Sequence, residues 1–451
     1  MSLIGTMYVG RTGLVNLGKG INITSDNLSN LNTYGFKESR GIFSDVFSKK
    51  ININSIGLGT QLTSVDTIFL EGSINVTDIP TDLAIHGKGF FMVYDPNSQK
   101  TYYTRNGAFH LENYNENYVK IVNPSGFSLK GQQLNNIATN IAGTGEILIP
   151  KNLAGKNTSL INLRFNLDAS IEIEKEDQPL KDAWNPEEDP PIKTSDYDWL
   201  LKVPYVDAQG RKKELTFYFD RTTEENQYEF IIISDPKAEE PLSAGTITFD
   251  GNGFVKEIQG PEMVSGADAK KENPDLEVED TAALLKLELG ENLPLFLDLG
   301  LKYNGNGELI SDQNAITSFA SPFVSYYQYQ NGYAPGFLES ISVDSEGIIH
   351  ATYSNNQTLE VAQILLASFT SDTVLSRVGQ TLFEAPPGIQ PAIFEPGNDM
   401  PASIVSGALE ASNVDIAQEM VNLITLQRAF QSNSKAVTVA DQLLDDVIRM
   451  R

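Results

Sequence analysis

Apolar residues recur every seven positions at the two ends of the chain, a pattern that the middle lacks. Near the N-terminus, one column comprises Met7, Leu14, Ile21 and Leu28, and a second comprises Leu3, Gly10, Leu17, Thr24 and Leu31. Near the C-terminus, the uninterrupted column comprises Ile416, Leu423, Phe430, Val437 and Leu444; its companion, apolar only at its ends, comprises Met420, Gln427, Ser434, Asp441 and Ile448. Such columns are typical of helices that pack side by side. The sequence therefore predicts a helix at each end, with other structure inserted between them.

The predicted N-terminal helix is weak by composition, because five glycines fall within it: Gly5, Gly10, Gly13, Gly18 and Gly20. Each costs about 0.8–1.0 kcal/mol relative to alanine in a helix interior, so this segment should become helical only when it docks. The natural partner is the C-terminal helix, predicted from about residue 413 to residue 448 because the run Ser412-Asn413-Val414-Asp415 fits a capped start. We favour packing between neighbouring copies of the chain. The alternative is a two-helix clasp that closes one monomer.

Twelve apolar positions carry this packing hypothesis, and we call them the heptad seam. They are Met7, Leu14, Leu17, Ile21, Leu28, Leu31, Ile416, Leu423, Phe430, Val437, Leu444 and Ile448.

Short β-rich runs bounded by Gly, Asn and Asp fill the middle, which is typical of antiparallel β domains. The fold class predicted is mainly β with terminal α-helices, the helices forming a coiled-coil-like domain with two β-rich domains inserted between them. The expected domains are a terminal helical domain (residues 1–34 and 407–451), a connecting segment (35–74), a first β domain (75–168 and 304–406) and a second β domain (169–303).

Charge is concentrated in the second β domain. The chain has 33 basic and 59 acidic residues, a net charge of −26, and residues 168–288 account for −17 of it. We expect this domain to face solvent. Nucleic acid and anionic membrane surfaces are disfavoured partners, because phosphates would be repelled. No apolar run is long enough to span a bilayer, and the first residues do not resemble a cleaved secretory signal.

The residues suggest no catalytic or metal site. The chain has no cysteine, and His86, His110 and His350 lie far apart in sequence. Gly87-x-Gly89 lacks the third glycine and the helix of a dinucleotide loop, and the stretch from Thr248 to Gly253 lacks the twelfth-position glutamate of a calcium loop, so a hairpin is expected there. We expect no enzyme activity, no cofactor and no metal.

Motifs at four separated places resemble the bacterial flagellar rod and hook family. The first is Asn27-Leu-Ser-Asn30-Leu-Asn32-Thr-Tyr-Gly35-Phe36-Lys37, of which Asn27, Asn30, Asn32, Gly35 and Phe36 form the family motif turn. The others are Asp82-Leu-Ala-Ile-x-Gly-x-Gly-Phe-Phe91, Tyr103-Thr-Arg-Asn-Gly107, and the run from Ser406 to Asp415 with Glu419-Met-Val421 and Gln427-Arg-Ala-Phe-Gln431. An Asn-rich turn that ends a helix is compatible with the same residues.

The large middle domain and two further segments, residues 331–336 and 351–358, resemble the hook branch of the family. Two features depart from the family pattern. Residues 112–117 replace a glycine turn, and without cysteine this chain cannot form the cysteine–lysine cross-link of some hooks.

The resemblance implies a structural subunit that self-assembles into a hollow, flexible helical tube, joins rod to filament and transmits torque. It also implies an extracellular location in the flagellar hook, after export without a cleaved signal peptide. The implied partners are other copies of the chain, the distal rod protein, the hook cap protein, the hook-filament junction protein and the flagellar export apparatus. The alternatives are a distal-rod-like axial protein or a secreted β-rich carbohydrate-binding or hydrolytic protein.

Overall fold

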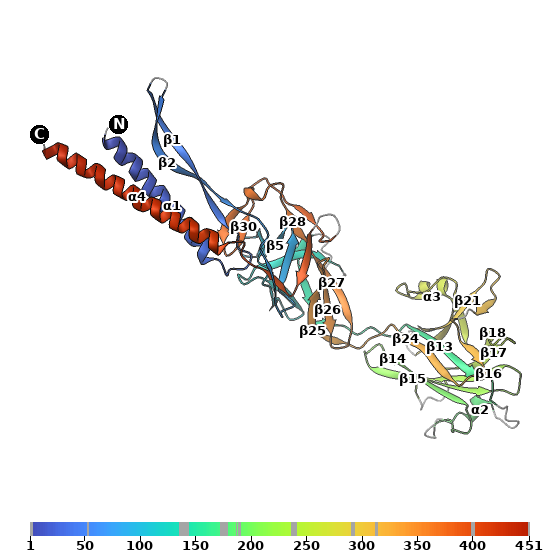
Figure 1. Ribbon diagram of the computed structural model, residues 1–451. Coiled ribbons are helices and arrows are strands. Elements are labelled where there is room, and N and C mark those ends of the chain that lie inside the picture. The colour runs from blue at the N-terminus through green and yellow to red at the C-terminus, as the bar shows by residue number, and fades with distance from the viewer. Residues whose placement is uncertain are drawn as a thin grey trace. The chain divides into compact units, whose positions relative to one another are not determined.

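The computed structural model describes residues 3–51, 54–134, 144–171, 179–185, 187, 191–235, 241–289, 294–311, 314–397 and 402–449. The chain divides into two compact units (Figure 1). The terminal unit comprises residues 1–151 and 338–451, and the central unit comprises residues 152–337. The observed class is mainly β with a helix at each end, as the sequence predicts.

The terminal unit contains two long helices, α1 (Leu3–Ser29) and α4 (Ile416–Arg449), which lie side by side (Figure 1). An antiparallel hairpin of β1 (Ser39–Ile51) and β2 (Asn54–Thr67) packs against α1. Sequence analysis predicts only a connecting segment here. The hairpin was missed because the apolar residues of β1 come in adjacent pairs, such as Ile42 and Phe43, rather than in alternation, and the register shifts between these two residues.

The β domain of the terminal unit is built from short, mostly antiparallel strands. Its main sheet runs β25 (Gly336–Val343), β26 (Ile348–Tyr353), β27 (Thr358–Ile364), β9 (Ser128–Gln133), β5 (Phe90–Asp95), β6 (Lys100–Thr104), β30 (Leu382–Glu384) and β29 (Ser376–Gly379). Further strands are β7 (His110–Asn113), β8 (Tyr118–Val122), β10 (Thr144–Glu146), β11 (Leu148–Pro150), β28 (Leu366–Ser368) and β31 (Ala392–Phe394), with a 3-10 turn η1 (Asp372–Val374).

Two small strand pairs bring the ends of the chain together beside this sheet. β3 (Ile74–Val76) pairs with β33 (Ala408–Glu410), and β4 (Leu83–Gly87) pairs with β32 (Ala402–Ser406). The segment that enters α4 is therefore held by strands from the first hundred residues.

The central unit is a β-sandwich. One sheet runs β19 (Glu262–Ser265), β20 (Ala282–Glu288), β21 (Pro294–Tyr303), β13 (Leu160–Asp168) and β23 (Thr317–Phe319), with β22 (Leu309–Ser311) and β24 (Val324–Gln330) joined to it. The other is a five-stranded meander of β14 (Trp199–Val206), β15 (Lys212–Arg221), β16 (Gln227–Ile233), β17 (Ser243–Phe249) and β18 (Val255–Gln259). Two short helices, α2 (Leu180–Ala183) and α3 (Gly266–Glu272), and the two-residue β12 (Asn152–Leu153) complete it.

The meander is covered on both faces, which explains its long apolar runs. Phe217 and Phe219 of β15 face the other sheet and pack in a core with Phe165. Tyr218, between them, points the other way into a smaller core with Leu180 and Ile192. Because alternate residues reach opposite faces, a strand buried on both sides has no polar alternation.

The central unit is larger than the second β domain expected from residues 169–303. It begins at residue 152 and ends at residue 337, because β13 and β24 lie in its sheet rather than in the terminal unit. β13 also pairs in parallel with β21 and β23, whereas the sequence predicts antiparallel β domains. Residues 260–275 contain β19 and α3, although their content of Gly, Pro and charge predicts a loop. The hairpin expected around residues 248–253 is present between β17 and β18.

Candidate functional site

The predicted heptad seam on α1 and just after it is only partly covered in the single chain. Its six members are all half-buried: Met7, Leu14, Leu17, Ile21, Leu28 and Leu31. The column on α4 is divided. Leu423, Val437 and Leu444 are half-buried, whereas Ile416 and Phe430 are 50% and 38% exposed. The side chain of Ile448 lies outside the described residues.

The companion column on α4 differs from the one expected. The residues that face inward are Glu419, Leu426, Asn433 and Ala440, each one position before the predicted Met420, Gln427, Ser434 and Asp441, which are exposed. Apolarity alone could not find this column, because two of its four members are polar. Glu419 is buried and accepts a hydrogen bond from Asn422 at 3.1 Å. A buried polar group costs little once it has such partners.

Glycines set how closely the helices approach. A Cβ on Gly10 would lie 2.5 Å from Cγ2 of Val437, and one on Gly13 would lie 3.0 Å from Nδ2 of Asn433. A Cβ on Gly20 would lie 3.3 Å from Leu426, whereas Gly18 has no atom within 4 Å. The glycine pattern therefore matches the C-terminal helix of the same chain, which is the geometry of the clasp alternative.

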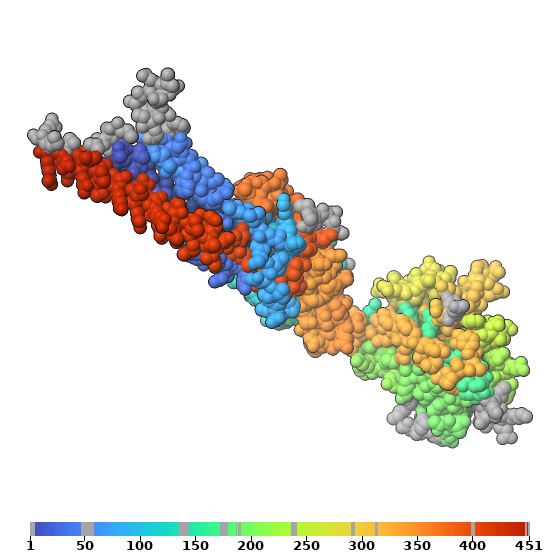
Figure 2. Space-filling model, viewed as in Figure 1, coloured from blue at the N-terminus to red at the C-terminus, as the bar shows by residue number. Residues whose placement is uncertain are grey.

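This pairing nevertheless leaves many apolar side chains exposed on the two helices, and Figure 2 shows α4 in red along one face of the unit. The exposed large apolar residues are Tyr8 and Val15 on α1, and Ile416, Met420, Val421, Ile424, Phe430, Val439 and Leu443 on α4. Large apolar side chains exposed in this number on two neighbouring helices indicate an interaction site. The helix pair can therefore close within one chain and still offer an apolar face to others.

The turn after α1 is fixed by three of the five motif residues. Asn27 is buried and clamps Ser39 through two hydrogen bonds, donating from Nδ2 to the carbonyl at 2.8 Å and accepting from the N–H at 2.9 Å. Gly35 has a φ of +68°, and a Cβ there would lie 2.4 Å from the backbone nitrogen of Asn106. Phe36 is buried beneath the guanidinium of Arg377, 4.4 Å from its ring centroid.

The other two motif residues act locally. Asn30 donates to the carbonyl of Asp26 at 2.9 Å and accepts from the hydroxyl of Thr33 at 3.2 Å, whereas Asn32 is exposed.

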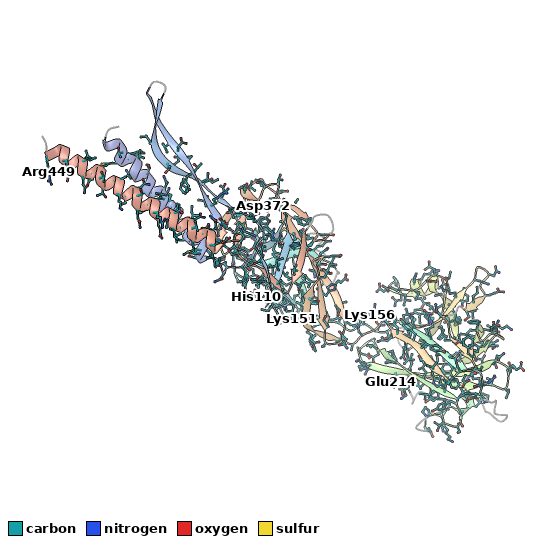
Figure 3. All side chains as sticks on the ribbon, viewed as in Figure 1. His110, Lys151, Lys156, Glu214, Asp372 and Arg449 are labelled. Atoms are coloured by element: carbon teal, nitrogen blue, oxygen red, sulfur yellow. The ribbon has the colours of Figure 1, made fainter. Side chains whose placement is uncertain are left out.

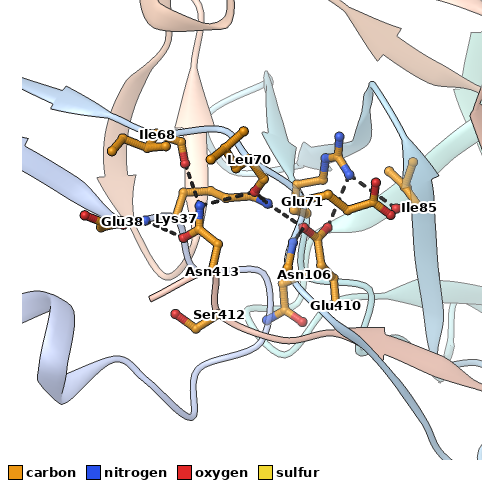
Figure 4. Close-up of polar contacts among 12 residues, drawn as sticks. Lys37, Glu38, Ile68, Leu70, Glu71, Ile85, Asn106, Glu410, Ser412 and Asn413 are labelled. Atoms are coloured by element: carbon orange, nitrogen blue, oxygen red, sulfur yellow. Dashed lines mark hydrogen bonds and ion pairs between the residues drawn. The ribbon is translucent and has the colours of Figure 1, made fainter. Parts of the chain in front are cut away.

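The residues that follow this turn contact a buried carboxylate, that of Glu410 (Figure 4). Glu410 is fully buried; one of its oxygens contacts Nζ of Lys37, and the other accepts from Nη1 of Arg105 at 3.2 Å. The N–H of Gly72 donates to the first oxygen at 3.0 Å, and the N–H of Gly35 donates to the Glu410 carbonyl at 2.8 Å. We call Lys37, Arg105 and Glu410 the charged anchor. It joins four segments that are far apart in sequence.

The two cations of the anchor reach further into the β domain. Nζ of Lys37 also donates to the carbonyl of Leu70 at 2.7 Å. Arg105 donates to the carbonyls of Ile85 at 3.3 Å and Gly87 at 2.7 Å. Burial lowers the pKa of Lys37, and the neighbouring Glu410 carboxylate raises it and so opposes that shift. Breaking such a buried pair from one side is costly, because an uncompensated charge remains.

Asn413 and Asp415 guide the chain into α4. Asn413 accepts from the N–H of Glu38 at 2.7 Å and donates to the carbonyls of Ile68 at 2.8 Å and Leu70 at 3.2 Å. The helix therefore begins later than the predicted residue 413. Asp415 supplies the cap, since its carboxylate accepts from the N–H groups of Ala417 at 2.8 Å and Gln418 at 3.2 Å.

Sequence reasoning did not assign a role to Lys37, Arg105, Glu410 or Asn413. Each lies inside one of the family motifs described above. A charged or amide side chain among residues otherwise suited to a core was the signal that could have identified them. The sequence does not show which of these residues pair with each other, because Lys37 and Glu410 are separated by 373 positions.

The histidines do not converge on one site. His86 contacts Glu71 at 2.8 Å, His350 contacts Asp344 at 3.3 Å, and His110 is exposed on β7 (Figure 3). Within the described ranges, no group of three or more His, Cys, Asp or Glu side chains is placed to hold a metal ion. In the same part of the chain, no helix has the length and apolarity needed to cross a membrane.

Replacing Glu410 with Gln should destabilise the terminal unit by about 3–5 kcal/mol, because Lys37 and Arg105 would remain buried without their carboxylate. The matched control is Glu384→Gln, which removes a partly exposed pair with Lys100 and should cost about 1 kcal/mol or less. Hydrogen exchange of amides in β4 and β33 under increasing urea measures both. Equal effects of the two substitutions would contradict a structural role for the anchor.

The cost of Glu410→Gln should also depend on pH. In the folded chain the pKa of Lys37 lies below 10.5, so the unfolded chain binds more protons between that lowered pKa and 10.5. Folding stability therefore rises with pH in this window. Removing the Glu410 carboxylate lowers the pKa of Lys37 further, so the variant begins this rise at a lower pH than the intact chain. The difference in unfolding free energy between the two chains should therefore narrow below the pH at which the intact chain's Lys37 titrates, and stay constant above it; urea unfolding at several pH values measures it.

Gly10→Ala and Gly18→Ala should have opposite effects on the helix pair. Alanine favours a helix by about 0.8–1.0 kcal/mol over glycine, so Gly18→Ala, with open space around it, should stabilise α1. The same change at Gly10 would force Val437 away from α1, costing about 1–3 kcal/mol. Thermal unfolding of the helices by circular dichroism at 222 nm would measure the shifts. Stabilisation by both variants would mean that α1 and α4 do not pack as described.

Comparison with known proteins agrees with this architecture. Four family profiles match in chain order: "Flagella basal body rod protein" (residues 7–37), "Flagellar hook protein FlgE/F/G D1 domain" (84–162), "Flagellar basal body protein FlaE D2 domain" (166–333) and "Flagellar basal body rod FlgEFG protein C-terminal" (405–450).

Relatives that match over the full length are named flagellar hook proteins. The flagellar hook protein FlgE of Borreliella burgdorferi is 28% identical over 476 residues, covering 100% of both chains. That of Salmonella typhimurium is 28% identical over 451 residues, covering 98% of each. A crystal structure of the Helicobacter pylori flagellar hook protein FlgE2 aligns with 75% of this chain and 100% of its own, at 14% identity and a TM-score of 0.47, which is too loose a match to support an argument. The four profiles and the full-length relatives show that this chain belongs to the flagellar rod and hook protein family, as a hook protein.

Proposed function

We propose that the chain polymerises through α1 and α4 into a hollow, flexible helical tube that joins rod to filament and transmits torque. One observation carries the proposal. The two terminal helices already pack against each other within the chain, yet nine large apolar side chains on them remain exposed. Ordered helices with an exposed apolar face gain stability from burying it against further copies. A repeated contact that does not close on itself gives an open helical polymer.

The charged anchor supports the mechanical part of this proposal. Torque must pass between the helices and the β domain of each subunit without the two turning independently. Glu410 bonds the segment after α1, the segment before β3 and the β6 region at once, and Asn413 ties the start of α4 to the residues around Ile68. Buried networks of paired charges hold one geometry because every alternative leaves a charge unpaired.

The proposed partners follow from the position of a hook. They are other copies of the chain, the distal rod protein, the hook cap protein, the hook-filament junction protein and the export apparatus, with the assembled polymer outside the cell. The profile named for basal body rod proteins matches residues 7–37, so the chain shares this segment with the rod subunits that it is proposed to follow. A distal-rod-like identity and a secreted carbohydrate-active protein are not favoured, because the full-length relatives are hook proteins.

Phe430→Ala should block polymerisation and leave the monomer folded. Phe430 is 38% exposed in the single chain, so its truncation costs the monomer less than the loss of a fully buried phenylalanine. In the polymer it is expected to be buried, where Phe→Ala costs about 3–5 kcal/mol at every subunit. Gln431→Ala, at the adjacent exposed position, is the matched control and should polymerise normally. Electron microscopy and sedimentation of both variants measure the outcome, and normal tubes from Phe430→Ala would count against this face.

Removing the central unit should leave polymerisation intact and change the stiffness or curvature of the tube. The N–H of Leu338 donates to the carbonyl of Lys151 at 2.8 Å, so the two ends of the terminal unit can be joined by a short Gly-Ser linker. The deletion of residues 152–337 removes a net charge of −18 but no residue of the heptad seam. Electron microscopy beside the intact chain provides the comparison. A well-folded deletion that forms no tubes would assign polymerisation to the central unit instead.

A further inference from the structure

Charge is distributed unevenly over the central unit. Residues 152–337 contain 34 acidic and 16 basic residues, a net charge of −18. None of these charges falls between Asp312 and Glu339, a stretch of 26 residues that includes β24. Two copies of such a unit repel each other wherever acidic surfaces meet, and repel least at this neutral stretch.

The exposed apolar residues of the unit gather in the same stretch. Among its described residues, seven large apolar side chains are exposed, and six of them lie between Asp312 and Glu339. They are Phe319 (43%), Val324 (41%), Tyr326 (59%), Tyr327 (50%), Tyr329 (50%) and Phe337 (70%); the seventh is Ile310 (49%). We call Phe319, Val324, Tyr326, Tyr327 and Tyr329 the tyrosine strip. The centres of protein interfaces are rich in aromatic side chains and poor in charged ones.

β24 is also an edge strand. Among the described strands it pairs only with β13, antiparallel, with Tyr329 opposite Asn162 and Tyr327 opposite Arg164. Five of its seven residues are exposed. Natural proteins protect long edges with charged side chains, proline or a covering loop, because an open edge invites another chain. β24 has neither a charge nor a proline, so this edge is chemically suited to contact.

A cavity of about 550 Å³ lies beside the strip. Its lining combines aromatic rings with Arg164 and small polar residues: Arg164, Asn314, Ala315, Thr317, Phe319, Tyr326 and Tyr327. Arg164 is the one charged residue of that lining, and its guanidinium is held by Asp298, with Nη2 donating to Oδ2 at 3.1 Å. Because Asp298 already neutralises Arg164, the donors that this lining offers to an acidic side chain are the phenolic hydroxyls of Tyr326 and Tyr327.

We infer that the tyrosine strip is the surface through which the central unit of one copy binds the acidic central unit of a second copy. This inference rests on the proposed function, which brings copies together. The contact joins the strip to a different, carboxylate-bearing face of the neighbour, with tyrosine hydroxyls donating to those carboxylates. Pairing of strip with strip would close a dimer and could not propagate along a helical polymer.

The test places a photo-cross-linking benzophenone amino acid at position 327 of the full-length chain, and at position 310 as the matched control. Ile310 has a similar exposure but lies outside the charge-free stretch. Equal amounts of ¹⁵N-labelled and unlabelled chains are polymerised, irradiated and digested, so that mass spectrometry separates adducts between copies from adducts within one. We expect position 327 to join an acidic peptide from residues 152–311 of a second copy, with at least about tenfold more product than position 310.

Charge substitutions supply the second measurement. Tyr326→Glu with Tyr329→Glu should lower the inter-copy yield at position 327 about tenfold, because carboxylates would then face carboxylates. Ile310→Glu should leave that yield within about twofold. All three positions are exposed, so the folded unit should tolerate each change.

The outcomes separate this inference from the function on which it rests. Normal tubes without inter-copy adducts at position 327 would overturn the inference alone. Adducts that join residues 324–330 of both copies, or that join position 327 to the terminal unit, would also overturn it. Failure of the unmodified chain to form any polymer would overturn the proposed function, and the inference with it.

Discussion

The structure depends on one buried carboxylate. Glu410 stands between Lys37 and Arg105, and its neighbours on the backbone come from the turn after α1 and from the segment before β3. Without it, two cations would lie in an apolar interior, and the strands that hold both helix ends would lose their common partner. Hydrophobic packing stabilises each β domain, but packing is non-directional. The orientation of the helices relative to their β domain is set by these directed, charge-assisted bonds.

Much of the fold follows from periodicity. The heptad columns predicted both terminal helices, and alternating β-rich runs predicted the strands of both units, because these patterns report local burial. Residues whose role depends on partners far away in the sequence were not predicted. The companion column on α4 was displaced by one position, since Glu419 and Asn433 are polar yet face inward. The charged anchor was not predicted for the same reason. A lysine that follows a glycine-phenylalanine turn is expected at the surface unless its buried carboxylate partner is known.

The central unit shows a different limit. The strands of this unit were predicted, but its bounds were not, because the sequences of β13 and β24 suit a sheet of the terminal unit as well as one of the central unit. Parallel pairing of β13 with β21 has no local signature, as the partners lie more than a hundred residues apart in sequence. The family motif predicted structure best where the backbone conformation requires a glycine. Gly35 could be assigned to a left-handed turn from sequence, and its φ is +68°.

The positions of the two helices in the chain have a consequence for folding order. Among the described elements α1 is made before α4, and Lys37, in the turn that follows α1, pairs with a carboxylate 373 residues later. Until the final segment emerges, α1 has five glycines and only the β1–β2 hairpin to pack against, so it nucleates structure poorly. A chain that stops short leaves its own beginning unfolded. The ends thus act as a check on completeness, since only a full-length molecule can present both halves of the surface that joins it to the next.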